Sequence, residues 1–264
     1  MKNRILNTLV KTSLFTTLLV YGASVFAGPI AYTVNLSNNN LATIDLMTGT
    51  LTNVGATGVT SMRGLTFGSD GTLFGVSQDT DQLYTINTST GAASTVGDLG
   101  VNGIGGLAID SAGNLFYGDE FGENFYSVNV GTGLATLIGN MGVSITGMAF
   151  DGSDILFGFA DTPESALYTM NTATGLPSLI GSVGFSSSDG GIAFASDGTL
   201  YYARLEGQVG TLNTATGAST QLFALNGQFS SLAIQNTSVP EPATLVLLGL
   251  GLFGLGFNKR KRLH

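Results

Sequence analysis

The stretch GLAIDSAGNLFYGD (106–119) decides the fold, because close copies of it recur along the chain. The other copies are GLTFGSDGTLFGVS (64–77), GMAFDGSDILFGFA (147–160) and GIAFASDGTLYYAR (191–204), and a fifth start, SLAIQN (231–236), is not continued. The second residues of these five segments are separated by 42, 41, 44 and 40 residues. Self-similarity at a period of about 40 residues indicates a repeat architecture in which each unit is one small structural element.

Each unit contains four short stretches with the composition of β-strands. The quoted segment supplies two of them, joined by a turn that contains glycine. A third and a fourth follow, as in FYSVNVGTGL (125–134) and ATLIG (135–139), and they are joined by an Asn-Thr-Xaa-Thr-Gly type of turn. Alternation of apolar and polar residues at period two, interrupted by such turns, is typical of an antiparallel meander. Four-stranded units of 40 to 45 residues predict the blades of a β-propeller.

The two ends of the repeat region complement each other. The region begins with only the last three strands of a unit, IAYTVN (30–35), LATID (41–45) and LTNVG (51–55), and ends with a lone first strand at 231–236. Together they complete one blade, which closes the ring and removes open sheet edges. We therefore predict an all-β, five-bladed β-propeller over residues 28–238. An open β-solenoid and a β-sandwich are the alternatives, but a solenoid needs no complementary ends.

Both termini carry targeting signals. Residues 1–27 form a basic start, an apolar run and a small-residue cleavage site that ends at Ala27, which predicts a signal peptide removed by signal peptidase. An N-terminal membrane anchor is the alternative. Residues 239–264 combine Pro240, Glu241 and Pro242 with an apolar run and a basic cluster of Lys259, Arg260, Lys261 and Arg262. The run of 15 residues predicts a short, marginal transmembrane helix, with the basic cluster on the cytoplasmic side.

This C-terminal arrangement resembles the PEP-CTERM sorting signal of Gram-negative bacteria. The resemblance covers about 26 residues, from Val239 to His264. It implies that an exosortase recognises Pro240-Glu241-Pro242 and removes the tail. It also implies export, transient anchoring in the inner membrane, and delivery to the cell surface or to the exopolysaccharide matrix of a biofilm. An ordinary tail anchor is the alternative.

Composition excludes several kinds of chemistry. The chain has no cysteine, and its one histidine is the last residue, so neither a Cys nucleophile nor a Ser-His-Asp triad can form in the body. Residues 28–238 hold sixteen acidic residues and two basic ones, Arg63 and Arg204, a formal charge of −14. A surface of this kind repels phosphate backbones, so we expect no nucleic-acid partner.

The acidic residues are divided unequally between the two faces of the predicted ring. We call the face with the first and third connections of each blade the turn face. The loop face carries the second connections and the links between blades, and it holds ten of the sixteen acids, among them Asp161 and Asp189. Its best clusters are Asp79 with Asp81, and Asp119-Glu120 with Glu123. Two interpretations stay open. The acids form a binding surface that uses Ca²⁺ as a cofactor, or they form a solvated surface that keeps an exported protein soluble.

The sequence favours a protein that is not an enzyme. We expect an exported surface or matrix protein whose propeller serves binding or adhesion, with exopolysaccharide or a surface glycan as partner. Phe121 and Phe185 are the loop aromatics that would suit stacking on a sugar. The alternative is a Ca²⁺-dependent hydrolase resembling gluconolactonase-type propellers. Such a site needs carboxylates at the starts of the first strands, where this chain offers Arg63, Gly105, Thr146 and Gly190.

Overall fold

The computed structural model describes residues 28–102, 104–162, 165–186 and 189–236. The predicted signal peptide with its cleavage site at Ala27, and the predicted C-terminal helix with its flanking motif and basic cluster, lie outside these residues. Within the described ranges, no helix is long and apolar enough to cross a membrane.

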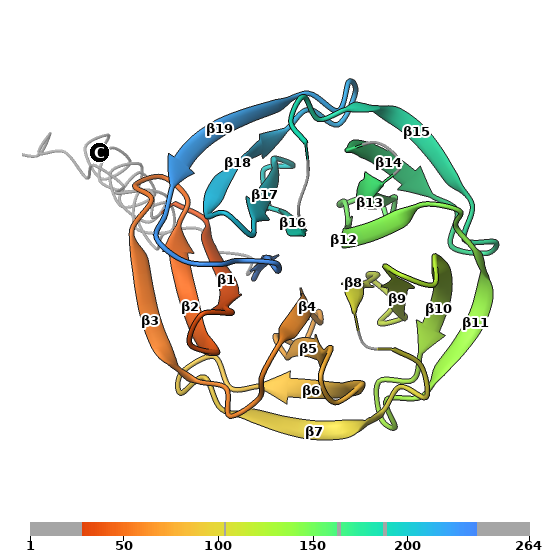
Figure 1. The fold of residues 1–264 in the computed structure, drawn as a ribbon, viewed down its shortest axis with the longest axis horizontal. Helices are drawn as coiled ribbons and strands as arrows, with labels where there is room; N and C mark the ends of the chain where they lie inside the picture. Colours follow the sequence, from red (N-terminus) through yellow and green to blue (C-terminus); the bar gives the residue numbers. More distant parts are fainter. Residues whose placement is uncertain (1–27, 103, 163–164, 187–188, 237–264) are drawn as a thin grey trace, which may run out of the picture.

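The described chain forms five four-stranded antiparallel sheets arranged as a ring (Figure 1). Blade 1 has the order β20-β1-β2-β3, and the other blades follow the chain, from blade 2 (β4–β7) to blade 5 (β16–β19). The strands of blade 1 are β20 (Ala233–Ile234), β1 (Ile30–Asn35), β2 (Asn40–Asp45) and β3 (Leu51–Ala56). Those of blades 2 and 3 are β4 (Met62–Phe67), β5 (Leu73–Ser77), β6 (Gln82–Ile86), β7 (Ala93–Asp98), β8 (Gly105–Ile109), β9 (Leu115–Asp119), β10 (Asn124–Val128) and β11 (Ala135–Asn140). Those of blades 4 and 5 are β12 (Ser144–Phe150), β13 (Leu156–Thr162), β14 (Ala166–Met170), β15 (Pro177–Ser182), β16 (Gly190–Phe194), β17 (Leu200–Arg204), β18 (Gln208–Leu212) and β19 (Ser219–Ala224).

The ring is closed by its own two ends. Strand β20 pairs antiparallel with β1, with Ala31 opposite Ile234 and Tyr32 opposite Ala233. The hydroxyl of Thr33 in β1 also donates a hydrogen bond of 2.7 Å to the carbonyl of Ser231, which lies just before β20. The predicted five-bladed propeller with terminal closure is therefore confirmed, and the solenoid and sandwich alternatives are excluded.

Glycines let the innermost strands approach one another closely. The inner strands β4, β8, β12 and β16 each contain a glycine at which an added Cβ would collide with the backbone or a Cβ of the next inner strand. These glycines are Gly64, Gly106, Gly147 and Gly191. A Cβ placed on Gly191 would lie 2.6 Å from Cα of Ser231, on the segment leading into β20. Real Cβ atoms do not come this close to backbone, so five blades fit around the axis only with glycine here.

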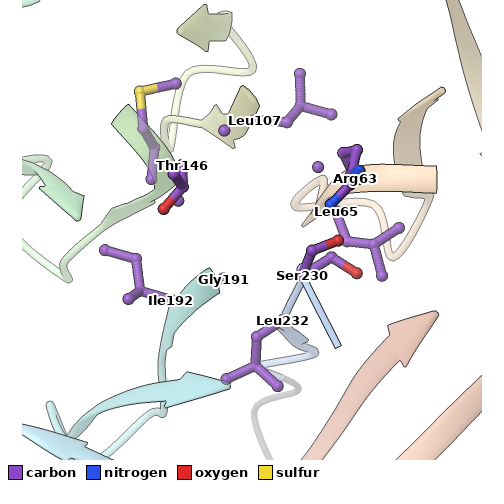
Figure 2. Close-up of a pocket in the computed structure, with 13 residues that line it drawn as sticks. Arg63, Leu65, Leu107, Thr146, Gly191, Ile192, Ser230 and Leu232 are labelled. Carbon is purple, nitrogen blue, oxygen red and sulfur yellow. The ribbon is translucent and has the colours of Figure 1, made fainter. Parts of the chain in front are cut away.

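A layer of apolar side chains closes the axis. It consists of one residue from each blade, the second of each repeat: Leu65, Leu107, Met148, Ile192 and Leu232. All five are buried. On the loop-face side of this layer, the remaining pocket holds about 10 Å³, the space of about one water molecule (Figure 2). A larger ligand at this end must therefore lie at the mouth of the axis and cannot enter it.

Candidate functional site

Both ends of the described body leave through the turn face. Ile30 is paired with Asp45 at the turn-face end of blade 1, and β20 runs antiparallel to β1, so Asn236 emerges at that same end. The side chain of Asn236 donates a 3.0 Å hydrogen bond to the carbonyl of Phe194. At the other terminus, the carbonyl of Pro29 accepts a 3.1 Å hydrogen bond from the amide of Leu46. The loop face is therefore the face remote from both attachments.

Polar side chains from all five blades lie around the opening of the axis on the loop face: Arg63 and Ser230 line the axial pocket, and Arg63 connects it with the carboxyl groups. We call this group the axial mouth: Arg63 of β4, Glu120 after β9, Asp161 of β13, Asp189 before β16 and Ser230 before β20. Figure 2 shows Arg63, Ser230 and Thr146 around the narrow pocket on the axis. The regular ring brings together residues that are up to 167 positions apart in the sequence.

An ion pair and two hydrogen bonds organise the axial mouth. The guanidinium of Arg63 forms an ion pair with Asp189, and both side chains are largely buried, with exposed fractions of 19% and 14%. Nε of Arg63 also donates a 3.1 Å hydrogen bond to Oε1 of Gln78. On its other side, Asp189 is hydrogen-bonded to the carboxyl group of Glu120. Arg63 therefore neutralises Asp189 and orients it toward Glu120.

Burial decides the protonation of the axial mouth. Glu120 is only 8% exposed. Burial first, and then the charges of Asp189 and Asp161, raise the pKa of Glu120 to about 8. Burial also raises the pKa of Asp189, although Arg63 opposes this change. Near neutral pH, Glu120 is thus the group that holds the proton and donates it to Asp189.

Three oxygens of the axial mouth have no hydrogen-bond partner although they are buried. They are Oε2 of Glu120, Oδ1 of Asp161 and Oγ of Ser230. A buried acceptor without a partner costs about 1–3 kcal/mol, and more for a charged group. Several such atoms at one place indicate that a ligand with hydrogen-bond donors, or ordered water, completes the arrangement.

The acidic residues singled out from the sequence have different surroundings. Glu120 belongs to the axial mouth, whereas Oδ1 of its neighbour Asp119 accepts a 3.1 Å hydrogen bond from the amide of Phe121 in its own loop. Glu123, which follows the turn and directly precedes β10, has a positive φ of 52°. The Asp119-Glu120-Glu123 cluster is therefore divided between the axis and the loop backbone.

The second predicted cluster lies on the connection between β5 and β6. Asp79 is exposed and accepts a 2.6 Å hydrogen bond from the hydroxyl of Thr60. This bond, and a second from Ser61, hold the pKa of Asp79 below its ordinary value. Asp81 has a positive φ of 52°. Burial first, and then nearby charges that include Asp119 and Asp81, raise the pKa of the Tyr117 phenol. Among the described residues, no three His, Cys, Asp or Glu side chains are arranged to hold a metal ion. The Ca²⁺ site stays a prediction.

Arg204 and Phe185 form a separate contact on the loop face. The guanidinium of Arg204 lies 4.1 Å from the ring centre of Phe185, donates a 2.8 Å hydrogen bond to the carbonyl of Ser186, and pairs with Glu206 at 3.3 Å. Phe185 also packs against Phe159 and is partly buried. Of the two loop aromatics predicted for stacking, only Phe121 stands free, with 69% of its surface exposed.

Sequence reasoning placed Asp161 and Asp189 on the loop face but did not connect them with Glu120. A usable signal lies in their position within the repeat. Asp189 directly precedes an inner strand, and Asp161 and Glu120 stand at the loop-face ends of second strands. In a closed ring these positions all approach the axis, so a comparison of equivalent repeat positions would have found them.

Comparison with known proteins bears on the tail and on the fold. The model of the PEP-CTERM protein-sorting motif matches residues 238–261, which include Pro240-Glu241-Pro242. A protein in a nidogen/laminin complex is similar in structure, with a TM-score of 0.56 and 17% identity over 78% of this chain and 80% of that one. A protein of unknown function from Bacteroides thetaiotaomicron VPI-5482 has a TM-score of 0.56 and 16% identity over 79% of this chain, which spans 62% of that protein.

No curated protein matches the sequence. At these identities the two structures support the fold alone. The C-terminal match is independent of them and covers the segment on which the resemblance was based, except for its last three residues, 262–264. The chain thus carries a PEP-CTERM protein-sorting motif at residues 238–261, attached to a body that is a five-bladed β-propeller.

Proposed function

We propose that this chain is a non-enzymatic surface or matrix protein of a Gram-negative bacterium, whose propeller binds exopolysaccharide or a surface glycan with its loop face. The sorting motif implies an exported protein that is transiently anchored in the membrane and processed by an exosortase. Signal peptidase would remove residues 1–27 at Ala27. The propeller fold fits a binding module, because a rigid ring presents variable loops on one face.

The observation that carries this proposal is the exit of both ends through the turn face. Six residues separate Asn236 from the apolar run that starts at Ala243, a reach of at most about 25 Å. While the tail is anchored, the turn face is therefore held near the membrane and the loop face is directed outward. The axial mouth and the exposed Phe121 lie on this outward face.

The alternative, a Ca²⁺-dependent hydrolase, fits the described residues less well. The axial mouth does contain three carboxyl groups, but Asp189 is already paired with Arg63, and Glu120 is hydrogen-bonded to Asp189. This donor set does not match the shell of six to eight oxygens that Ca²⁺ prefers.

Polysaccharide binding tests the proposal directly. The full-length chain in a non-ionic detergent is mixed with exopolysaccharide purified from the producing bacterium, and the bound fraction is measured by co-sedimentation. Phe121→Ser on the loop face should lower binding severalfold, because an exposed ring contributes about 1 kcal/mol or more at a sugar contact. Met47→Ser on the turn face is the matched control, since Met47 is 64% exposed. Equal binding by both variants, or none by the parent chain, would refute the proposed function.

A further inference from the structure

We propose that the axial mouth binds a primary ammonium group of a ligand, with Asp161, Glu120 and Ser230 as acceptors. The inference deepens the proposed function, on which it rests: the glycan partner would carry amino sugars with free amines. A lysine side chain offers the same chemical group, and the experiment below distinguishes the two sources.

The charges of the axial mouth match one monovalent cation. Asp189 is neutralised by its ion pair with Arg63. Glu120 is protonated near neutral pH, because burial and neighbouring carboxylates raise its pKa to about 8. Asp161 is then the carboxylate of this group that has no cation paired with it among the described residues. One negative charge is left over, and one ammonium group would balance it.

The unpaired acceptors match the donors of an ammonium group in number. An ammonium group has three N–H bonds to donate. Within the axial mouth, three buried oxygens have no hydrogen-bond partner: Oδ1 of Asp161, Oε2 of Glu120 and Oγ of Ser230. Protonated Glu120 donates from one oxygen to Asp189, which leaves Oε2 free to accept.

Burial of Glu120 separates this site from an ordinary acidic surface. Carboxylates on a surface are hydrated and need no further partner, whereas Glu120 is 92% shielded from solvent and retains an oxygen without a hydrogen bond. The other groups that face it are Asp161, Asp189 and Arg63. Because none of these donates to Oε2, a donor from outside the chain is the natural partner.

The shape of the mouth agrees with a small cationic head on a larger ligand. The pocket on the axis holds about 10 Å³ and ends at the apolar layer that contains Leu65 and Leu232. An ammonium group can therefore sit at the mouth while the rest of the ligand stays outside, over the loop face. There the ring of Phe121, next in sequence to Glu120 and 69% exposed, offers an apolar surface for the body of a sugar.

Calorimetric titration of the full-length chain in a non-ionic detergent at pH 6 tests the inference. Glucosamine should bind, whereas N-acetylglucosamine, which has the same ring but no ammonium group, should bind at least about tenfold more weakly. Nα-acetyl-lysine amide is the second ammonium probe. Tighter binding of glucosamine identifies a glycan source, and tighter binding of the lysine derivative identifies a protein source. Equal binding of glucosamine and its acetylated form would overturn the inference.

Substitutions locate the binding. Asp161→Asn should weaken glucosamine binding about tenfold or more, because it removes the unbalanced charge. Ser230→Ala should weaken it about threefold and keeps the inference testable if Asp161→Asn does not fold. Glu123→Gln, in the same loop as Glu120 but outside the axial mouth, is the control and should bind within twofold of the parent chain.

Unchanged affinity in both Asp161→Asn and Ser230→Ala would overturn the assignment of the site. Failure of the ammonium site and failure of the proposed function give different results. A chain that binds glucosamine through Asp161 but retains no exopolysaccharide would refute the glycan partner alone. A chain that retains exopolysaccharide but discriminates neither amine would refute the ammonium site alone.

Discussion

Replacing Gly191 by alanine should weaken the closure of the ring. Gly191 lies in the inner strand β16, and a Cβ at this position would lie 2.5 Å from the carbonyl carbon and 2.6 Å from Cα of Ser231. These are backbone atoms of the segment that enters β20, so no side chain can rotate away to make room. The segment would have to move outward by about 1 Å, and β20 has only two residues paired with β1 to hold it.

The size of the effect follows from two opposing contributions. Overpacking of a rigid site costs about 1–3 kcal/mol. Alanine also has less conformational freedom than glycine in the unfolded chain, which stabilises the folded state by about 0.4–1 kcal/mol. Because backbone atoms cannot rotate away, the cost lies at the upper end of its range, about 3 kcal/mol, and we expect a net loss of about 2 kcal/mol in the free energy of unfolding. For a body of this size, this lowers Tm by about 4–8 °C.

Thermal and urea unfolding of the full-length chain, followed by far-UV circular dichroism, measure this loss. Gly152→Ala is the matched control, because Gly152 lies in a turn and a Cβ there meets nothing within 4 Å. The control should equal the parent chain or exceed it slightly in stability. If Gly191→Ala and Gly152→Ala unfold at the same temperature and urea concentration, then the inner strands are not packed backbone against backbone, and our reasoning about the five-bladed ring is wrong.

Two further substitutions test the core and the axial mouth. Leu232→Ala removes one member of the apolar layer, 2% exposed, and should lower the free energy of unfolding by about 2–5 kcal/mol in a urea titration; a loss below 1 kcal/mol would mean that the axis is not tightly packed. Glu120→Gln should flatten the dependence of stability on pH. Because the folded-state pKa of Glu120 is raised to about 8 from 4.5, the native state holds an extra proton between these values, and the parent chain loses stability as pH rises through this window. Because the hydrogen bond between Glu120 and Asp189 shares the effect between the two carboxyl groups, we expect a difference of about 2–3 kcal/mol between pH 5 and pH 8 relative to Glu120→Gln; parallel curves for the two chains would contradict the assigned protonation.

The fold could be predicted from the sequence because the relevant information is local and repeated. Each unit contains its own strands and turns, and the incomplete units at residues 30–55 and 231–236 reveal how the ring closes. The closing strand is shorter than expected, with only Ala233–Ile234 in the ladder. The physical reason is that the Ser231 carbonyl bonds to the hydroxyl of Thr33, a side chain, instead of a backbone amide.

The axial mouth could be predicted only in part. Its residues come from five blades, and the sequence shows on which face each lies but not which of them meet. Asp119 and Glu120 are neighbours in the chain, yet one caps its own loop and the other lies at the axis. Only the closed ring decides between these two surroundings, because it places Asp189 of blade 5 against Glu120 of blade 3.

Closure by the two termini also sets the order of events during biosynthesis. Thr33 and Ser231 are 198 positions apart, so the first strand leaves the ribosome about 10–40 s before its partner does. Joining such distant segments costs about 1.4 kcal/mol more chain entropy than joining neighbours 40 residues apart. During this interval, one edge of β1 is unpaired and open to association with other chains. Substitutions that weaken β20 should therefore increase aggregation of new chains more than they reduce the stability of finished ones.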